Sequence, residues 1–146
     1  MLAHTIQLAL APVFVLVAIG NIMNLLSSRL GRVVDRSRQL QALYRTTTDA
    51  EHDAVVREIR LVAQRIRVIG RAILLMVLAG LAIGAVVGLL FLEEFAGLAL
   101  QPVIAGVFIV AISLLMMALL LFLHETRIAT AALEIPETYL ELERKL

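Results

Sequence analysis

Three long stretches without a formal charge dominate the chain, at residues 5–28, 72–92 and 95–123. A helix needs roughly 20 residues to cross a hydrocarbon core about 30 Å thick, and each stretch is long enough to do so. The pattern therefore predicts an all-α integral membrane protein with three transmembrane helices. We place these spans at residues 5–28, 72–92 and 98–123, with a short loop at 93–97.

In the polar segment 29–71, between the first two spans, apolar residues recur with a helical period on both sides of a turn. This pattern predicts two further helical stretches. Threonines 46–48 mark a turn, and Thr48 followed by Glu51 has the spacing of a helix-capping box. We expect a long antiparallel helical hairpin continuous with spans one and two, and we treat residues 1–146 as one membrane domain. On either side of the turn, apolar residues share one helix face at 100° per residue. They are Leu30, Val33, Val34, Leu40 and Tyr44 before it, and Val55, Ile59, Val62, Ile66 and Ile69 after it.

Composition supports the membrane assignment. The chain is 61% hydrophobic with a mean hydropathy of +0.95, whereas roughly half of the residues are apolar in a typical soluble domain. The leader before the first span has no Lys or Arg, so we do not expect that span to be a cleaved signal peptide. The tail 124–146 is predicted to hold a short helix that Pro136 opens.

Lys and Arg are distributed very unevenly around the spans. None precedes span one, ten lie in 29–71, none lies in 93–97, and three follow residue 123. The positive-inside rule predicts that 29–71 and the C-terminus are cytoplasmic, with the N-terminus and 93–97 outside. The basic residues are twelve arginines and one lysine. Either a GC-rich genome or a need for the guanidinium fork, which recognises carboxylates and phosphates, explains this bias.

Part of this positive charge is predicted to form a cationic collar at the cytoplasmic end of the bundle. It has three readings: a solvated helix face with local ion pairs, a surface for anionic headgroups at about 1 kcal/mol per basic residue, or a cationic vestibule. Nucleic acid is not an expected partner, because aromatic residues are scarce and the local net charge is modest. The collar consists of Arg29, Arg32, Arg36, Arg60, Arg67 and Arg71.

Span one carries a stripe that is polar at both ends and apolar in the middle. It either lines an ion pore with a hydrophobic constriction at Phe14 and Val17, or forms hydrogen bonds between packed helices. The stripe consists of Gln7, Phe14, Val17, Asn21, Asn24, Ser28, Arg32 and Asp35.

Glycines recur every four residues in span two, at Gly80, Gly84 and Gly88. Because they lack side chains, they allow another helix to approach closely along that face. Three spans with such a seam form a thin bundle, which favours self-association into a homo-oligomer.

Motifs for catalysis are missing. His124 and Glu125 begin like a zinc-protease helix, but Ile128 stands where the second histidine is required. No phosphate loop, dinucleotide fingerprint or nucleophile constellation is present, so we expect no enzyme, no cofactor and no metal site. A weak alternative is a proton or cation site formed by His4 with Glu93 and Glu94, which lie on the same predicted side.

Several of these residues carry a resemblance to a known family. They are Pro12, Asn24, the run of Arg29, Arg32, Asp35 and Arg36, and the segment from Arg65 to Arg71. Together they make the chain, over nearly its whole length, resemble the small bacterial membrane proteins grouped as domain of unknown function 2721. The resemblance implies a multi-pass protein of the bacterial inner membrane. It implies no activity, substrate or catalytic residue.

Two functional hypotheses follow. The first is a homo-oligomeric pore lined by span one, and the second is a non-conducting scaffold or adaptor whose arginine-rich hairpin binds a protein partner or anionic lipid. A transporter ranks third, because acidic or basic residues within the spans usually mark ion pathways and none lies there.

Overall fold

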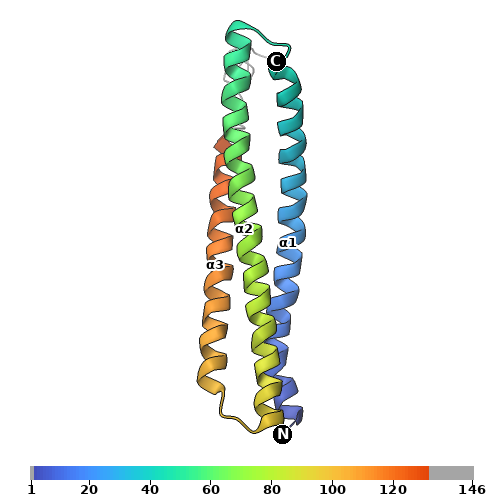
Figure 1. The fold of residues 1–146 in the computed structure, drawn as a ribbon, viewed down its shortest axis with the longest axis vertical. Coiled ribbons are helices and arrows are strands. Elements are labelled where there is room, and N and C mark those ends of the chain that lie inside the picture. The colour runs from blue at the N-terminus through green and yellow to red at the C-terminus, as the bar shows by residue number, and fades with distance from the viewer. Residues whose placement is uncertain (1, 132–146) are drawn as a thin grey trace, which may run out of the picture.

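The computed structural model describes residues 2–131, which form three helices (Figure 1). These are α1 (Leu2–Tyr44), α2 (Asp49–Ala96) and α3 (Gln101–Ala131). All three are long and apolar enough to cross a membrane, which confirms the prediction of an all-α chain with three such helices. The short helix expected after Pro136 lies outside the described residues.

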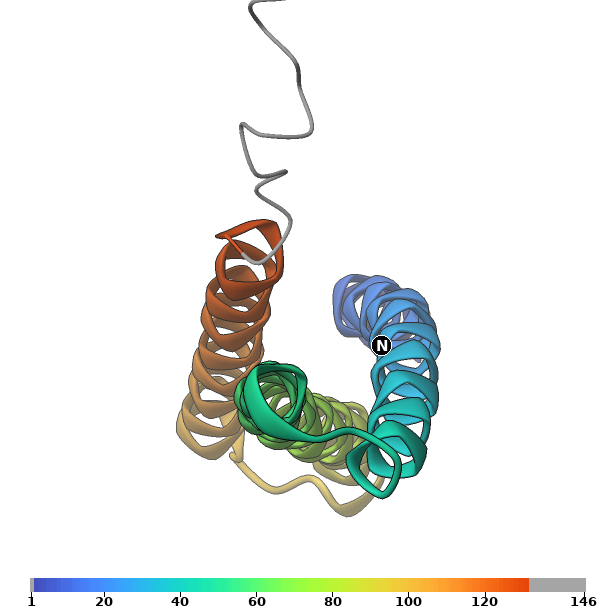
Figure 2. The same cartoon turned by 90° about the horizontal axis from the view of Figure 1, so that it is seen from above.

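Helix α2 lies in the middle of the bundle. It packs against both α1 and α3, whereas α1 and α3 make far fewer direct contacts with each other, and Figure 2 shows the two outer helices on either side of it. Neighbouring helices in the chain run antiparallel, with connections at 45–48 and 97–100. Within residues 2–131, α1 and α2 continue past the end of α3 to the turn that joins them (Figure 1).

The turn between α1 and α2 differs in detail from the predicted capping box. Thr48 is the N-cap of α2, with extended backbone, but its side chain makes no capping hydrogen bond. The prediction of that bond is therefore wrong. The hydroxyls of Thr46 and Thr47 instead donate to the carbonyl oxygen of Leu43, at 3.1 and 2.9 Å. The backbone N–H groups of Thr46 and Thr47 donate to the same oxygen at 3.0 and 3.1 Å, so residues after the end of α1 supply the partners that this carbonyl lacks within the helix.

A left-handed glycine ends α2. Gly97 has φ 65°, and its N–H donates to the carbonyl oxygen of Glu93 at 3.0 Å. This is the usual helix C-cap conformation, which a residue without a Cβ adopts at little cost. The chain can then reverse within four residues and begin α3.

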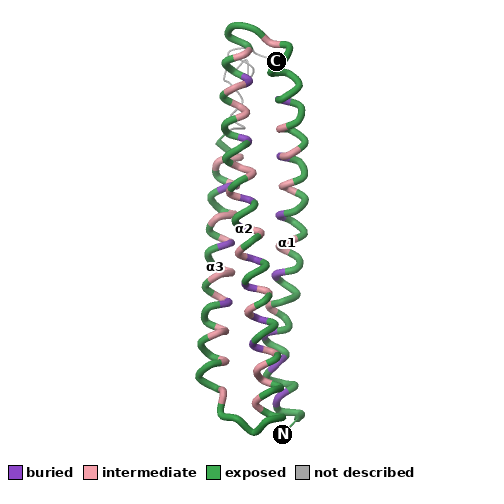
Figure 3. Tube along the Cα trace, in the orientation of Figure 1, coloured by how far each residue is buried: buried purple, intermediate pink, exposed green. Residues whose placement is uncertain are grey.

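Buried residues recur at seven-residue intervals on all three helices, and Figure 3 marks them in purple along each trace. Such spacing places one stripe of each helix against its neighbour and is typical of left-handed coiled-coil packing. On α1 the buried row is Thr5, Pro12, Ile19, Leu26, Val33 and Leu40. On α2 there are two rows, Val55, Val62, Ile69, Met76 and Ile83, and Ala72, Ala79 and Val86. On α3 the row is Ala111, Ala118 and Glu125.

The three glycines of α2 differ in their surroundings. A Cβ added at Gly80 would lie 3.7 Å from Leu16 Cδ1, so this glycine faces α1. Gly84 and Gly88 are exposed, and a Cβ at either would have nothing within 4 Å in the described part of the chain. Close approach of another helix to that open face therefore stays a prediction.

The small residues of the second α2 row set how closely the helices pack. Ala79 is fully buried, so we expect Ala79→Leu to overpack the seam and destabilise the fold by about 1–3 kcal/mol. Ala85→Leu adds the same atoms at an exposed position of the same helix and serves as the control. Unfolding followed by circular dichroism in a mild detergent measures both; equal stability of the two variants would contradict the packing described.

Candidate functional site

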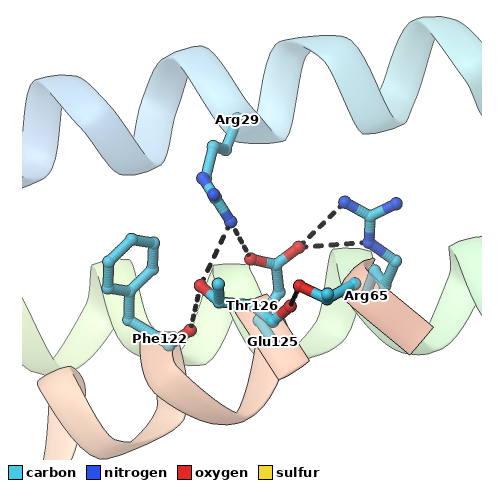
Figure 4. A network of polar contacts seen from close by, with 6 residues as sticks. Arg29, Arg65, Phe122, Glu125 and Thr126 are labelled. Carbon is cyan, nitrogen blue, oxygen red and sulfur yellow. Dashed lines mark hydrogen bonds and ion pairs between the residues drawn. The ribbon is translucent and has the colours of Figure 1, made fainter. Parts of the chain in front are cut away.

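The most unusual side chain in the described structure is Glu125, which is fully buried. It lies seven residues after Ala118 and so occupies a seam position that is apolar elsewhere on α3. Arg29 of α1 approaches one carboxylate oxygen, with Nη1 2.6 Å from Oε2. Arg65 of α2 donates to the other oxygen, Oε1, through Nε at 3.1 Å and Nη2 at 2.9 Å (Figure 4). One carboxylate therefore links all three helices.

Neighbours on α3 hold Arg29 in place. Its Nη1 also donates to the hydroxyl oxygen of Thr126 at 3.3 Å, and that hydroxyl donates to the carbonyl oxygen of Phe122 at 2.9 Å. The Arg29 guanidinium carbon lies 5.0 Å from the centroid of the Phe122 ring, within the range of a cation–π interaction. The arginine is thus fixed by a charge, a hydroxyl and an aromatic face.

The three charged side chains of this cluster differ in their exposure to solvent. The Glu125 side chain is 0% exposed, while those of Arg29 and Arg65 are 27% and 25% exposed. An unpaired carboxylate in this position would lose several kcal/mol of solvation, so its pairing with two cations is a condition of its burial. The arginines, in contrast, keep part of their surface available to solvent or to a ligand.

A second ion pair lies further along α1 and α2. Arg36 Nη2 is 2.7 Å from Glu58 Oε1, and the two side chains are 47% and 43% exposed. Exposed pairs of this kind contribute about 0–1 kcal/mol. This pair therefore modifies the local charge more than it stabilises the fold.

Four arginines line one cavity at this end of the bundle. The cavity has a volume of about 350 Å³, and its arginines are Arg29, Arg32, Arg36 and Arg65. Its apolar wall includes Val33 and Val62, and Ala129 of α3 closes one side. All three helices contribute to it, so the cavity depends on the packing that Glu125 secures.

The structure divides the predicted cationic collar into two groups. Arg29, Arg32 and Arg36 line the cavity together with Arg65, which the prediction of the collar omitted. The other three members, Arg60, Arg67 and Arg71, are exposed on α2, and within residues 2–131 they form no ion pair.

All eight residues of the predicted stripe on α1 are exposed. The apolar pair in its middle is among the most open, with Phe14 70% and Val17 58% exposed. At 3.6 residues per turn the stripe lies on the side of α1 opposite the row that packs against α2. Apart from Arg32, which lines the cavity between the three helices, the stripe therefore lies away from the helix contacts formed within residues 2–131.

The opposite end of the bundle brings His4, Glu93 and Glu94 to one cavity of about 350 Å³. The Thr5 hydroxyl donates to Glu94 Oε2 at 3.1 Å, and the Leu100 N–H donates to Glu93 Oε1 at 3.2 Å. Within residues 2–131 no group of three or more His, Cys, Asp or Glu side chains is arranged to hold a metal ion. Glu93 therefore acts on the connection between α2 and α3, whereas Glu94 joins α2 to α1.

Sequence reasoning did not identify Glu125 or Arg65 as partners. Glu125 was considered only as part of an incomplete zinc motif, and the zinc reading has no place for an ion pair. The available signal was its spacing, because Ala111, Ala118 and Glu125 are seven residues apart and coiled-coil seams repeat at that interval.

The fold and this cluster define a class: a three-helix protein whose helices can each cross a membrane and whose packed interior contains one carboxylate held by two arginines. A family model described as protein of unknown function (DUF2721) matches residues 9–135. The chain belongs to this family, as its resemblance at the sequence level predicted. No curated protein and no solved structure matches the chain.

Removal of the Glu125 charge tests the energetic role of the cluster. We expect Glu125→Gln to destabilise the protein by about 3 kcal/mol, because it leaves two neighbouring, partly buried guanidinium groups without their carboxylate. Glu58→Gln is the matched control and should change stability by less than about 1 kcal/mol, since its ion pair is exposed. Denaturant titration in detergent micelles compares the two; a smaller effect at Glu125 than at Glu58 would refute this account.

Proposed function

We propose that the protein assembles into a homo-oligomer in which α1 of each subunit lines an ion-conducting pore. The observation that carries this proposal is the exposure of all eight residues of the α1 stripe. Seven of them lie away from the row that packs against α2, and Arg32 also lines the cavity between the three helices. A face that the subunit itself leaves uncovered is available to surround an axis between subunits.

The polar members of the stripe favour assembly for a physical reason. Asn21 and Asn24 are exposed within the charge-free stretch of α1, where lipid offers no hydrogen-bond partners. Facing an axis, their amides would contact water or the same residues of another subunit. Hydrogen bonds of this kind between membrane helices contribute about 0.6–2 kcal/mol each.

In this arrangement the parts of the stripe have different roles. Gln7 lies at the outer mouth, Phe14 and Val17 form an apolar constriction that gates by dewetting, and Arg32 gives the inner mouth positive charge. The charge balance of the flanks supports an orientation with the arginine-rich end in the cytoplasm of a bacterium and the N-terminus outside its inner membrane. The exposed face at Gly84 and Gly88 is a candidate surface for close contact between subunits.

Subunit number is the first test of the pore. Native mass spectrometry from mild detergent or nanodiscs should give a defined ring of four or more subunits, because fewer helices leave no central channel of this construction. A monomer or a simple dimer would exclude a central pore lined by α1.

The asparagines provide the second test. We expect Asn21→Leu combined with Asn24→Leu to abolish or strongly alter conductance in planar bilayers while the ring survives, because two polar rings of the lining become apolar. Ser113→Leu is the control, since Ser113 is an exposed polar residue on α3 outside the stripe. Unchanged conductance in the asparagine variant, with the ring intact, would rule out the lining role of α1.

A second candidate function is a membrane scaffold, and a separate observation favours it. Arg60, Arg67 and Arg71 are exposed on one helix and have no ion-pair partner in the described part of the chain. A surface of this kind suits an acidic segment of a cytoplasmic protein or a layer of anionic headgroups. In this case the spans only anchor the arginine-rich end at the membrane.

Charge reversal separates the scaffold from the pore. Arg60→Glu with Arg67→Glu should abolish pull-down of a cytoplasmic partner or binding to anionic vesicles, and should leave conductance unchanged. The Asn21/Asn24 double variant is the reciprocal control, because it leaves these arginines intact and should retain binding. Full binding by the charge-reversed protein would contradict the scaffold role of this surface.

A further inference from the structure

We propose that the cavity lined by Arg29, Arg32, Arg36 and Arg65 is a binding site for a phosphate group. Of these four arginines, Arg29 and Arg65 are held by Glu125, and Arg32 has no ion-pair partner among residues 2–131. Phosphate is the ligand whose charge and oxygen geometry best match several guanidinium groups that converge from different helices.

Unused hydrogen-bond donors remain at the cavity. A guanidinium has five N–H donors, and Arg29 uses only Nη1 while Arg65 uses Nε and Nη2 in bonds to Glu125 and Thr126. Among residues 2–131, Nη1 of Arg65 and the other two nitrogens of Arg29 form no hydrogen bond, and Arg32 forms none through any of its nitrogens. Several donors can therefore reach one anion without breaking an existing pair.

The local charge favours an anion. The four arginines contribute four positive charges, and the two carboxylates paired with them, Glu125 and Glu58, contribute two negative charges, which leaves a net charge of about +2. Part of the wall is apolar, through Val33 and Val62. Low-dielectric walls around charges of one sign concentrate the field in the cavity and raise the local anion concentration.

Pre-organisation strengthens this argument. Arg29 and Arg65 are held by Glu125, and Arg29 also rests against Phe122 (Figure 4). A ligand that binds them need not immobilise two long, flexible side chains, so the entropy cost of binding is smaller. Glu125 therefore acts as a positioning residue for the site, and the cavity offers an already assembled pair of cations.

The position of the cavity along the helices allows two sources of phosphate, a lipid headgroup and a soluble phosphate ester. Arg29 directly follows the charge-free stretch that ends at Ser28, and Glu125 lies two residues after the one that ends at Leu123. Lipid phosphates lie at this depth, just outside the hydrocarbon core, and a soluble phosphate ester reaches it from the aqueous side. The shared chemistry is a phosphate mono- or diester, and the experiment separates the two sources.

This inference goes beyond the scaffold proposal, because it assigns a ligand to different residues. The scaffold surface consists of Arg60, Arg67 and Arg71, and none of them lines the cavity. Loss of binding on charge reversal of that surface and loss of binding at the cavity are therefore separate results. Neither depends on subunit number or on conduction.

The test uses the full-length protein in detergent and in nanodiscs. Inorganic phosphate is titrated by calorimetry in detergent. Nanodiscs of phosphatidylglycerol or of phosphatidylcholine are compared by native mass spectrometry for the lipid that the protein retains.

Arg32→Gln removes a cavity donor that has no role in the packing, and we expect the affinity for phosphate to fall roughly tenfold, as for the loss of one charge-assisted hydrogen bond. Arg38→Gln is the control, because Arg38 is exposed on the same helix and does not line the cavity.

A variant that is expected to increase the affinity for phosphate provides a second test. Glu58→Gln releases Arg36 from its ion pair and removes a negative charge beside the cavity, so affinity should rise severalfold. Arg32-dependent binding of inorganic phosphate supports a site open to soluble phosphate, and Arg32-dependent retention of phosphatidylglycerol alone supports a headgroup site. The proposal is overturned if neither ligand binds, or if Arg32→Gln and Arg38→Gln weaken binding equally, as expected for diffuse attraction.

Discussion

The pairing of Glu125 with Arg29 and Arg65 is the constraint on which the arrangement of the three helices depends. The seam positions before it on α3, Ala111 and Ala118, are small and apolar, and non-directional packing of such residues permits sliding and rotation. A carboxylate with two fixed partners permits neither, because any shift along the seam would leave a buried charge unpaired. Direct contacts between α1 and α3 are sparse, so the bond from Arg29 to Glu125 also sets how far apart the outer helices lie.

The two sides of α1 differ in their surroundings. One side supplies the buried row that packs on α2, and the other carries the exposed stripe from Gln7 to Asp35. Arg29 lies close to the buried row and is drawn inward, whereas Arg32, one turn further, belongs both to the stripe and to the cavity. A change in how Arg29 is held would therefore reach the exposed face through less than one turn of helix.

Much of this fold follows from local pattern, and the site does not. The charge-free stretches predict the spans, because the bilayer thickness fixes the length that a helix needs, and helical periodicity identifies the α1 stripe from residues within one segment. The ion pairs of Glu125 join residues separated by 96 and 60 positions, and no local rule specifies which of ten nearby arginines is chosen. The capping box failed for a related reason: spacing identifies the N-cap position of Thr48, but not whether its hydroxyl turns toward the helix.

The structure also bears on why the chain uses arginine so heavily. At Arg65, two nitrogens of one guanidinium contact a single carboxylate oxygen and a third remains for another ligand; at Arg29, one nitrogen serves the carboxylate and a hydroxyl while the ring of Phe122 covers the group. An ammonium is a compact, strongly hydrated charge without this planar, divided set of donors. Lysine at either position would neutralise Glu125 but present less to the cavity. Arg38 is exposed and lies outside the cavity, so the geometry of the guanidinium group explains arginine at Arg29 and Arg65 but not at Arg38.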